Sequence, residues 1–283
     1  MRSDTLPSFI VIGAVKAATT WIAHQLQQHP KVFLPGPEPH FFSTEYGRGV
    51  EWYRSWFNAA PSGSVVGEKS ADYLAHPEAA KRMFDILPSA RLIAQLRNPV
   101  DRAYSDYCML YRRGTVAGDP ERYLNHANPE SARFLEYGLY ARHLSRFLNH
   151  FERGQLLVVL HEDVARRPET VIADVCRHIR VEPKFNPHEV MKRVKNRASP
   201  SLPLALRRAL RPFKEAVAPL RDRNWFKGLH GLFARPTTYP PMTDTLRQRL
   251  QDYYLPDIQN LEQILGRDMT PWLTKKSSMT EPA

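Results

Sequence analysis

The chain has 283 residues, of which 42% are hydrophobic and 24% charged, which fits a folded domain with a sizeable core and excludes a disordered or membrane-spanning chain. Its 40 lysines and arginines outnumber 29 acidic residues, and the net charge of +11 favours anionic ligands or surfaces. The first residues lack the apolar run of a leader, and Cys108 and Cys176 lack metal-ligand spacing. We therefore expect a cytoplasmic protein with reduced thiols.

Apolar runs of strand length alternate with segments of helical periodicity along most of the chain. Strands are expected at 9–13, 65–67, 91–96 and 156–160, and helices at 19–29, 77–87, from Asn98-Pro99 onward, at 169–178 and around Leu246 to Tyr254. This alternation predicts an α/β fold, a single domain over 1–283 with a central parallel sheet flanked by helices. Ligands are expected at the carboxyl ends of its strands.

The positive charge is concentrated between residues 192 and 235, which contain twelve basic residues and two acidic ones. Within this segment, 201–217 has the pattern of a basic amphipathic helix. The segment is expected to flank the domain or to be inserted in it. A solvated helical face is the ordinary alternative, and contact with a membrane surface is also compatible with the pattern.

A turn suited to phosphate follows the first strand. Gly13 ends the strand, Lys16 adds a cation, and Thr19 and Thr20 add hydroxyl donors at the start of a helix, where backbone N–H groups are free. The Gly-Lys-Ser/Thr order of a Walker A loop is absent. An ordinary turn whose lysine points to water is the alternative from this segment alone.

The sequence Lys-Ala-Ala-Thr-Thr at 16–20 resembles the 5′-phosphosulfate loop of the sulfotransferases that use 3′-phosphoadenosine 5′-phosphosulfate (PAPS), with Ala18 at the usual glycine position. Arg97, followed by Asn98-Pro99 and by Ser105 eight positions later, resembles their 3′-phosphate site. Arg97 also ends a strand, and its planar fork suits phosphate. The resemblance implies PAPS as donor, 3′-phosphoadenosine 5′-phosphate (PAP) as product, and nucleotide binding by Lys16, Ala17, Ala18, Thr19, Thr20, Trp21, Arg97, Ser105, Arg235 and Tyr239.

Two further segments resemble the heparan sulfate and related carbohydrate sulfotransferases: Pro-Glu-Pro-His-Phe-Phe at 37–42 and Gly-Glu-Lys-Ser-Ala-Asp-Tyr at 67–73. The resemblance implies that Glu38 is the general base and that His40 and Lys69 line the site. Taken alone, the first segment also fits core packing and Glu68-Lys69 fits a surface ion pair. Glu68 is the competing candidate for the base.

These observations predict metal-free, in-line transfer of a sulfuryl group from PAPS to a hydroxyl, on a carbohydrate or a glycosylated small molecule. The expected catalytic residues are Glu38, Lys16, His40 and Lys69, with Lys16 at the bridging oxygen of the donor. Segment 192–235 is expected to border the acceptor entrance, and no nucleic acid partner is expected. Two alternatives are a P-loop-type nucleotide kinase and a non-catalytic binder of an anionic polymer or membrane.

Overall fold

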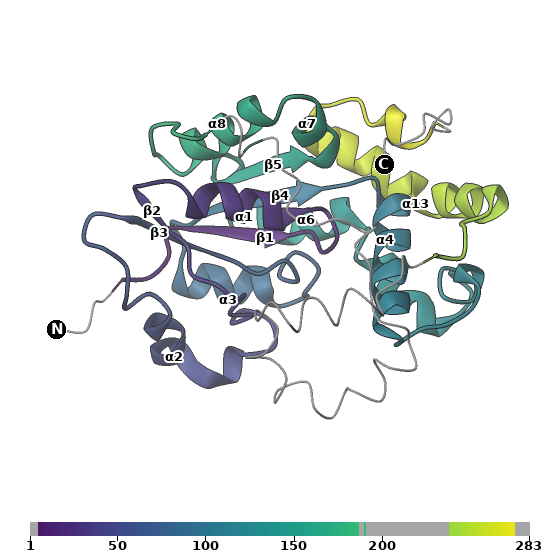
Figure 1. Cartoon of the computed structure of the whole chain (residues 1–283), viewed down its shortest axis with the longest axis horizontal. Coiled ribbons are helices and arrows are strands. Elements are labelled where there is room, and N and C mark those ends of the chain that lie inside the picture. Colours follow the sequence, from purple (N-terminus) through teal and green to yellow (C-terminus); the bar gives the residue numbers. More distant parts are fainter. Residues whose placement is uncertain (1–4, 187–189, 191–237, 275–283) are drawn as a thin grey trace, which may run out of the picture.

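A computed structural model describes residues 5–186, 190 and 238–274 and shows a five-stranded sheet at its centre (Figure 1). The strands follow the order β2-β3-β1-β4-β5, and every neighbouring pair is parallel. Their bounds are Phe9–Gly13 (β1), Val32–Phe33 (β2), Val65–Lys69 (β3), Arg91–Leu96 (β4) and Leu156–Leu160 (β5). The predicted α/β fold with a central parallel sheet is confirmed.

The strand predictions hold best where most of the strand is apolar. β1, β4 and β5 have the expected bounds, because strands covered by helices on both faces are continuous apolar runs. β3 continues two residues beyond the expected end, through Glu68 and Lys69. β2 was not expected, since two residues of strand leave no periodic pattern in the sequence.

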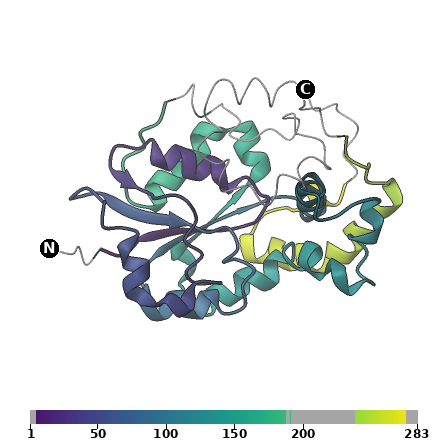
Figure 2. The same cartoon turned by 60° about the horizontal axis from the view of Figure 1, so that its bottom comes forward.

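Helices cover both faces of the sheet (Figure 2). The bounds are α1 (Thr19–Gln27), α2 (Gly49–Ser55), α3 (Ala79–Ile86), α4 (Pro99–Arg113), α5 (Ala132–Glu136), α6 (Tyr140–Leu148), α7 (His161–Arg166), α8 (Pro168–His178) and α13 (Asp244–Leu265). The side chains of β1 alternate between two cores, because successive residues of a strand point to opposite faces. Phe9 and Val11 pack with α1 and α8, whereas Ile10 and Ile12 belong to the core shared with α2, α3, α4, α6 and α13.

Helix α4 starts where β4 ends, as the Asn98-Pro99 pair predicts. The Asn98 side chain accepts hydrogen bonds from Val100 N at 3.0 Å and Asp101 N at 3.4 Å, and Pro99 occupies the first turn. Asn98 Nδ2 also donates to Trp272 O at 2.9 Å, which fixes the segment after α13 beside this strand end.

Some of the expectations concern residues outside the described ranges. These are the amphipathic helix at 201–217, the basic segment at 192–235 and Arg235. Among the described residues no helix is long and apolar enough to cross a membrane, and Cys108 and Cys176 are buried free thiols.

Candidate active site

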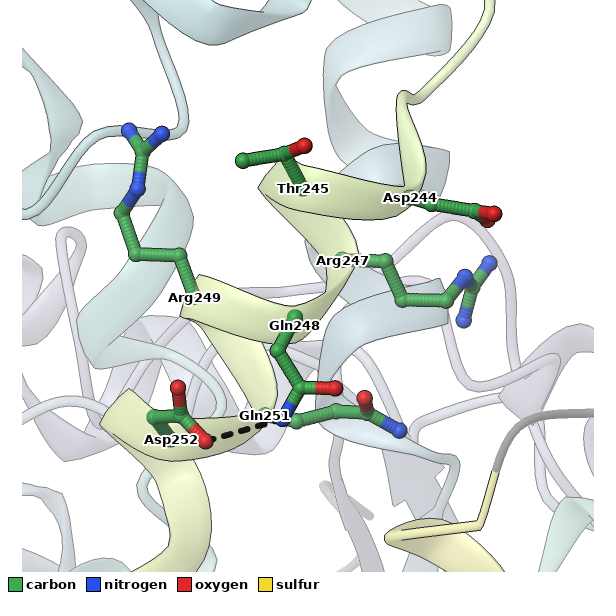
Figure 3. Close-up of a pocket in the computed structure, with 7 residues that line it drawn as sticks. All are labelled: Asp244, Thr245, Arg247, Gln248, Arg249, Gln251 and Asp252. Carbon is green, nitrogen blue, oxygen red and sulfur yellow. Dashed lines mark hydrogen bonds between the residues drawn. The ribbon is translucent and has the colours of Figure 1, made fainter.

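A hollow beside α13 contains none of the predicted site residues (Figure 3). It is lined by Asp244, Thr245, Arg247, Gln248, Arg249, Gln251 and Asp252. Arg247 donates to Asp101 at 3.0 Å and Gln248 to Asp252 at 3.0 Å, so these side chains tie α13 to its neighbours and to itself. The predicted site lies elsewhere, at the carboxyl ends of β1, β3 and β4.

The turn between β1 and α1 has the backbone of an anion site. No side chain caps α1, and its first turn contains no acidic residue, so the N–H groups of Thr19 and Thr20 and the positive end of the helix dipole can meet a ligand. Lys16 and Ala18 both adopt left-handed backbone conformations, each with φ 68°. Glycine adopts this conformation without strain, and at the exposed Ala18 the methyl group costs roughly 1–2 kcal/mol.

Two expected donors of this turn are already used within the protein. Trp21 N donates to Ala18 O at 2.8 Å, and the Trp21 indole donates to Val190 O at 3.0 Å from within the core. Ala17 N donates to Ala14 O at 3.1 Å. The resemblance implied nucleotide contacts for both residues, and these contacts stay a prediction; in the structure Trp21 anchors α1 and Ala17 closes the turn.

Arg97 follows the strand next to β1. Gly13 is in register with Ala94, so Lys16 and Arg97 each lie three residues beyond a matched pair on neighbouring parallel strands. Ser105 is buried two turns into α4, the helix that begins just after Arg97. The carbonyl of Arg97 accepts a 2.9 Å hydrogen bond from the Tyr140 hydroxyl, which fixes the backbone at this point.

Tyr239 also lies against α4. Its ring meets that of Tyr111 at a centroid distance of 6.1 Å, and Tyr104 donates to Pro240 O at 2.9 Å. The segment from 238 onward therefore packs on the helix that contains Ser105. The other residue expected from this loop, Arg235, lies outside the described residues.

Gly13 brings the segment after β3 against the end of β1. A Cβ atom at Gly13 would lie 2.7 Å from Leu74 Cβ and 2.9 Å from Ala71 O. Two hydrogen bonds hold this contact: Ser70 N donates to Val11 O at 3.2 Å and Leu74 N to Ile12 O at 2.8 Å. The segment 69–74 is therefore fixed beside the phosphate-type turn.

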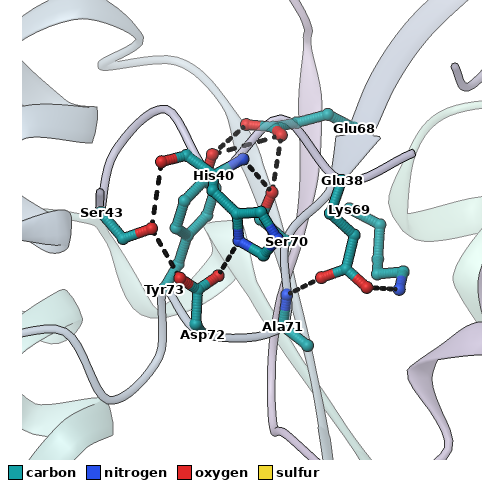
Figure 4. A network of polar contacts seen from close by, with 9 residues as sticks. All are labelled: Glu38, His40, Ser43, Glu68, Lys69, Ser70, Ala71, Asp72 and Tyr73. Atoms are coloured by element: carbon teal, nitrogen blue, oxygen red, sulfur yellow. Dashed lines mark hydrogen bonds and ion pairs between the residues drawn. The ribbon is translucent and has the colours of Figure 1, made fainter. Parts of the chain in front are cut away.

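Glu38 and Lys69 form an ion pair in this region (Figure 4). Lys69 Nζ donates to Glu38 Oε1, and Ala71 N donates to Glu38 Oε2 at 2.9 Å. The Lys69 side chain is 10% exposed and that of Glu38 29%, so the pair is shielded while the carboxylate stays open to solvent. Both residues are therefore held at the same point, Lys69 by β3 and Glu38 by the loop after β2.

His40 is held by Asp72, a residue that the sequence analysis did not single out (Figure 4). Nδ1 of His40 lies 2.8 Å from Asp72 Oδ1, and Ser43 Oγ donates to Asp72 Oδ2 at 2.6 Å. The hydrogen bond to Asp72 raises the pKa of His40 above its ordinary value. Burial acts to raise the pKa of Asp72, but the hydrogen bonds from His40 and Ser43 outweigh it and leave that pKa lowered.

The loop that carries Glu38 and His40 is anchored by the two residues after it. Phe41 and Phe42 are fully buried, and Phe41 stacks on Tyr53 with ring centroids 4.3 Å apart. Core packing, the alternative for this segment, is therefore correct for the two phenylalanines. It is wrong for His40, whose side chain is 42% exposed.

Glu68 points away from Lys69, because adjacent strand residues face opposite sides (Figure 4). Its fully buried carboxylate accepts hydrogen bonds from the hydroxyls of Tyr53 at 2.6 Å, Tyr73 at 3.1 Å and Ser70 at 3.2 Å. Burial raises the pKa of Glu68 to about 7, although these hydrogen bonds oppose the shift. The alternative of a surface pair between Glu68 and Lys69 is wrong, and Glu68 has no exposed surface on which to meet an acceptor.

Glu38, His40 and Asp72 bring three metal-ligand types together, with one donor atom from each within 4.8 Å of the others. Each group is already paired within the protein: Glu38 with the Lys69 ammonium, and Asp72 with His40 Nδ1 and Ser43. The cluster thus consists of two neighbouring hydrogen-bonded groups, Glu38 with Lys69 and Asp72 with His40 and Ser43, and a lysine already supplies the cation beside Glu38.

The model of the sulfotransferase domain family matches residues 6–200. Human heparan sulfate glucosamine 3-O-sulfotransferase 6 is 29% identical over 268 residues, which cover 93% of this chain and 72% of that protein. The mouse bifunctional heparan sulfate N-deacetylase/N-sulfotransferase 4 is 29% identical over 309 residues, covering 96% of this chain and 32% of the relative. The mouse 3-O-sulfotransferase 3B1 is 34% identical over 59% of this chain and 44% of its own length. The chain thus spans less than half of the latter two relatives.

Among solved structures, a sulfotransferase from Alicyclobacillus acidocaldarius is similar, with a TM-score of 0.72 and 26% identity. The match covers 95% of this chain and 100% of that one. A sulfotransferase domain from the curacin biosynthetic pathway, with a TM-score of 0.51 and 15% identity, shares the fold.

Proposed function

This chain belongs to the sulfotransferase domain family, and we propose that it transfers a sulfuryl group from PAPS to a hydroxyl of an acceptor. One observation carries the proposal: the Glu38–Lys69 pair is fixed next to a turn suited to phosphate, through the contact of segment 69–74 with Gly13. A nucleotide kinase would use carboxylates at that place to hold Mg²⁺, whereas Glu38 is paired with the Lys69 ammonium, and a non-catalytic binder would need no carboxylate there. The family match also favours the transferase over both alternatives.

The described residues fit the donor. The uncapped N-terminus of α1, together with Lys16 and the hydroxyls of Thr19 and Thr20, would bind the 5′-phosphosulfate end of PAPS. Arg97 and Ser105 would take the 3′-phosphate from the neighbouring strand and from α4.

Each residue of the site has a separate role in the transfer. As the sulfur–oxygen bond to the nucleotide breaks and the bond to the acceptor oxygen forms, Glu38 takes the acceptor proton. Lys16 stabilises the negative charge that grows on the leaving phosphate oxygen. Lys69 has N–H donors beyond the one it gives Glu38, and with His40 it contacts the sulfuryl oxygens.

We also propose that the transfer proceeds without a metal ion. Lys69 provides a positive charge beside Glu38, and His40, whose pKa is raised by its hydrogen bond to Asp72, provides a second when it is protonated. A divalent cation at this cluster would have to displace or repel both groups.

A saccharide is the acceptor class that we propose. Two observations support a sugar hydroxyl as the acceptor group. The matched relatives are named for heparan sulfate, and the segments with Glu38 and His40 resemble those of carbohydrate sulfotransferases. Segment 192–235, with its excess of positive charge, would border the entrance for an acceptor that already bears anionic groups.

Two measurements test the proposal. PAP should raise the melting temperature of the protein in a buffer containing EDTA, and ATP with Mg²⁺ should not. Radiolabelled PAPS should then transfer its label to an acceptor from a panel of N-sulfated and desulfated heparan fragments, simple glycosides and lipid alcohols. Stabilisation by ATP with Mg²⁺ but not by PAP would overturn the proposal, and transfer to a lipid alcohol alone would correct the acceptor class.

A further inference from the structure

Two separate sets of hydrogen bonds fix His40, one to its backbone and one to its ring. The backbone N–H donates to Ser70 Oγ at 3.0 Å, and the His40 carbonyl accepts from Ser43 N at 3.2 Å and from Glu45 N at 3.1 Å. These contacts keep a left-handed conformation with φ 53°. The ring is held separately, through Nδ1, by Asp72.

Asp72 itself is fixed from both sides. Ser43 donates to its second carboxylate oxygen at 2.6 Å, so the oxygen opposite His40 is engaged as well. Two residues earlier, Ser70 N is bound to Val11 O, and two residues later, Leu74 N is bound to Ile12 O. Asp72 therefore fixes the imidazole of His40 relative to strand β1 and to the turn that follows this strand.

We infer that Asp72 is a positioning residue for the transfer: with Ser43 it holds the His40 ring so that Nδ1–H is bound and Nε2 faces the reacting group. The inference rests on the proposed function and adds a residue to it. Nε2 has no partner among the described residues, and the ring keeps 42% of its surface exposed. Because a bond at one ring nitrogen determines which nitrogen is available for chemistry, Asp72 leaves Nε2 to meet the reacting group, and Nε2 donates a hydrogen bond when the ring is protonated.

The surrounding charges favour a protonated His40. Three carboxyl groups act on it, those of Asp72, Glu38 and Glu68, and all of them raise its pKa, while burial lowers it. Lys69 lies nearby but is paired with Glu38. Of these groups Asp72 alone is hydrogen-bonded to the ring, so it has the largest effect on the imidazolium.

The test is a comparison of Asp72→Asn, Ser43→Ala and Asp85→Asn. Asp72→Asn keeps the size and an acceptor oxygen but removes the charge. We expect the pKa of His40, followed by NMR of the imidazole in the nucleotide-free protein, to fall, and the alkaline limb of kcat to move to lower pH. We expect kcat to fall roughly 10²-fold, the scale of a misplaced catalytic group. Ser43→Ala should act in the same direction more weakly, and Asp85→Asn, which removes an exposed partner of Lys81, should do neither.

A double-mutant cycle separates positioning from general support of the loop. If Asp72 acts through His40, Asp72→Asn should lower kcat little further in a His40→Gln background. An equal loss in both backgrounds, or an unchanged pKa of His40 in Asp72→Asn, would overturn the inference. If the wild-type protein transfers no sulfuryl group, the proposed function fails, while the imidazole titration still decides whether Asp72 controls His40. If Asp72→Asn does not fold, Ser43→Ala carries the same titration.

Discussion

At the scale of single residues, the site depends on which charges are paired in the resting protein. Glu38 meets Lys69 and a backbone N–H, whereas Glu68, its sequence competitor, meets only hydroxyl groups inside the core. A carboxylate has about four lone-pair positions, so Glu38 keeps the capacity to accept a proton from an incoming hydroxyl. Glu68 has no such access.

Glu38→Gln should lower kcat by about 10²-fold or more and leave PAP affinity nearly unchanged, because the amide keeps the shape and removes the basicity. Initial rates with labelled PAPS and calorimetric titration of PAP measure the two effects. Glu45→Gln is the matched control, since Glu45 lies in the same loop and, among the described residues, its carboxylate pairs with the exposed Arg48. Near-normal turnover in Glu38→Gln would show that Glu38 is not the general base, and it would leave the family assignment unchanged.

Glu68 should make the protein less stable as the pH rises. Its pKa is about 7 in the folded protein, above the ordinary carboxyl value, so between those values the folded state binds a proton that the unfolded state releases. The free energy of unfolding, measured with urea, should therefore fall as the pH is raised from about 5 to about 8. Glu68→Gln should flatten this slope, and an equal slope in both proteins would contradict the assignment.

Ala18→Gly should stabilise the protein. The left-handed conformation at Ala18 costs roughly 1–2 kcal/mol for a residue with a Cβ atom. The greater freedom of glycine in the unfolded chain offsets about 0.4–1 kcal/mol of that cost. Thermal unfolding should show a gain of up to about 1.6 kcal/mol, whereas Ala17→Gly, at a buried position, should show a loss. A loss in Ala18→Gly would mean that the methyl group makes a contact of its own.

At the scale of elements, the site is assembled by three parallel strands that end together. β1 leads to the phosphate-type turn, β4 to Arg97, and β3 to Lys69 and Asp72. Parallel strands place such residues at one edge whatever their distance in sequence. The closeness of β3 to β1 beyond their last paired residues depends on Gly13.

Gly13→Ala should therefore damage stability and activity together. The new Cβ would press on Leu74 Cβ and Ala71 O at under 3 Å, and the segment with Asp72 would have to move away from β1. We expect a loss of about 2 kcal/mol or more in urea unfolding, the scale of an overpacked site. kcat should fall further than the fraction unfolded explains. Gly47→Ala, where no atom lies within 4 Å of the new methyl group, is the control and should change neither quantity.

At the scale of the whole molecule, the excess positive charge lies mainly in 192–235. The triple variant Arg207→Glu, Arg208→Glu, Arg211→Glu should have a higher KM for an anionic acceptor and a nearly unchanged KM for PAPS. It should also flatten the rise of acceptor KM with salt, since fewer charges remain to be screened. Unchanged kinetics across salt concentrations would leave this segment as a solvated face. Cytoplasmic localisation stays a prediction.

The amino-acid sequence was sufficient to predict the parallel sheet, the turn after β1 and the place of Arg97 just beyond β4, while phosphate binding at these two places stays a prediction. Each of these is encoded locally, as an apolar run or as residues within a few positions of a strand end. It was not sufficient for Asp72, for the pairing of Glu38 with Lys69 or for the burial of Glu68, which depend on contacts between residues 15 to 33 positions apart. The alternation of β3 did contain a signal, because neighbours on a strand cannot share a face. Which face meets tyrosine hydroxyls and which meets Glu38 is a property of the packed molecule, since it depends on how two loops are brought together by the strands that carry them.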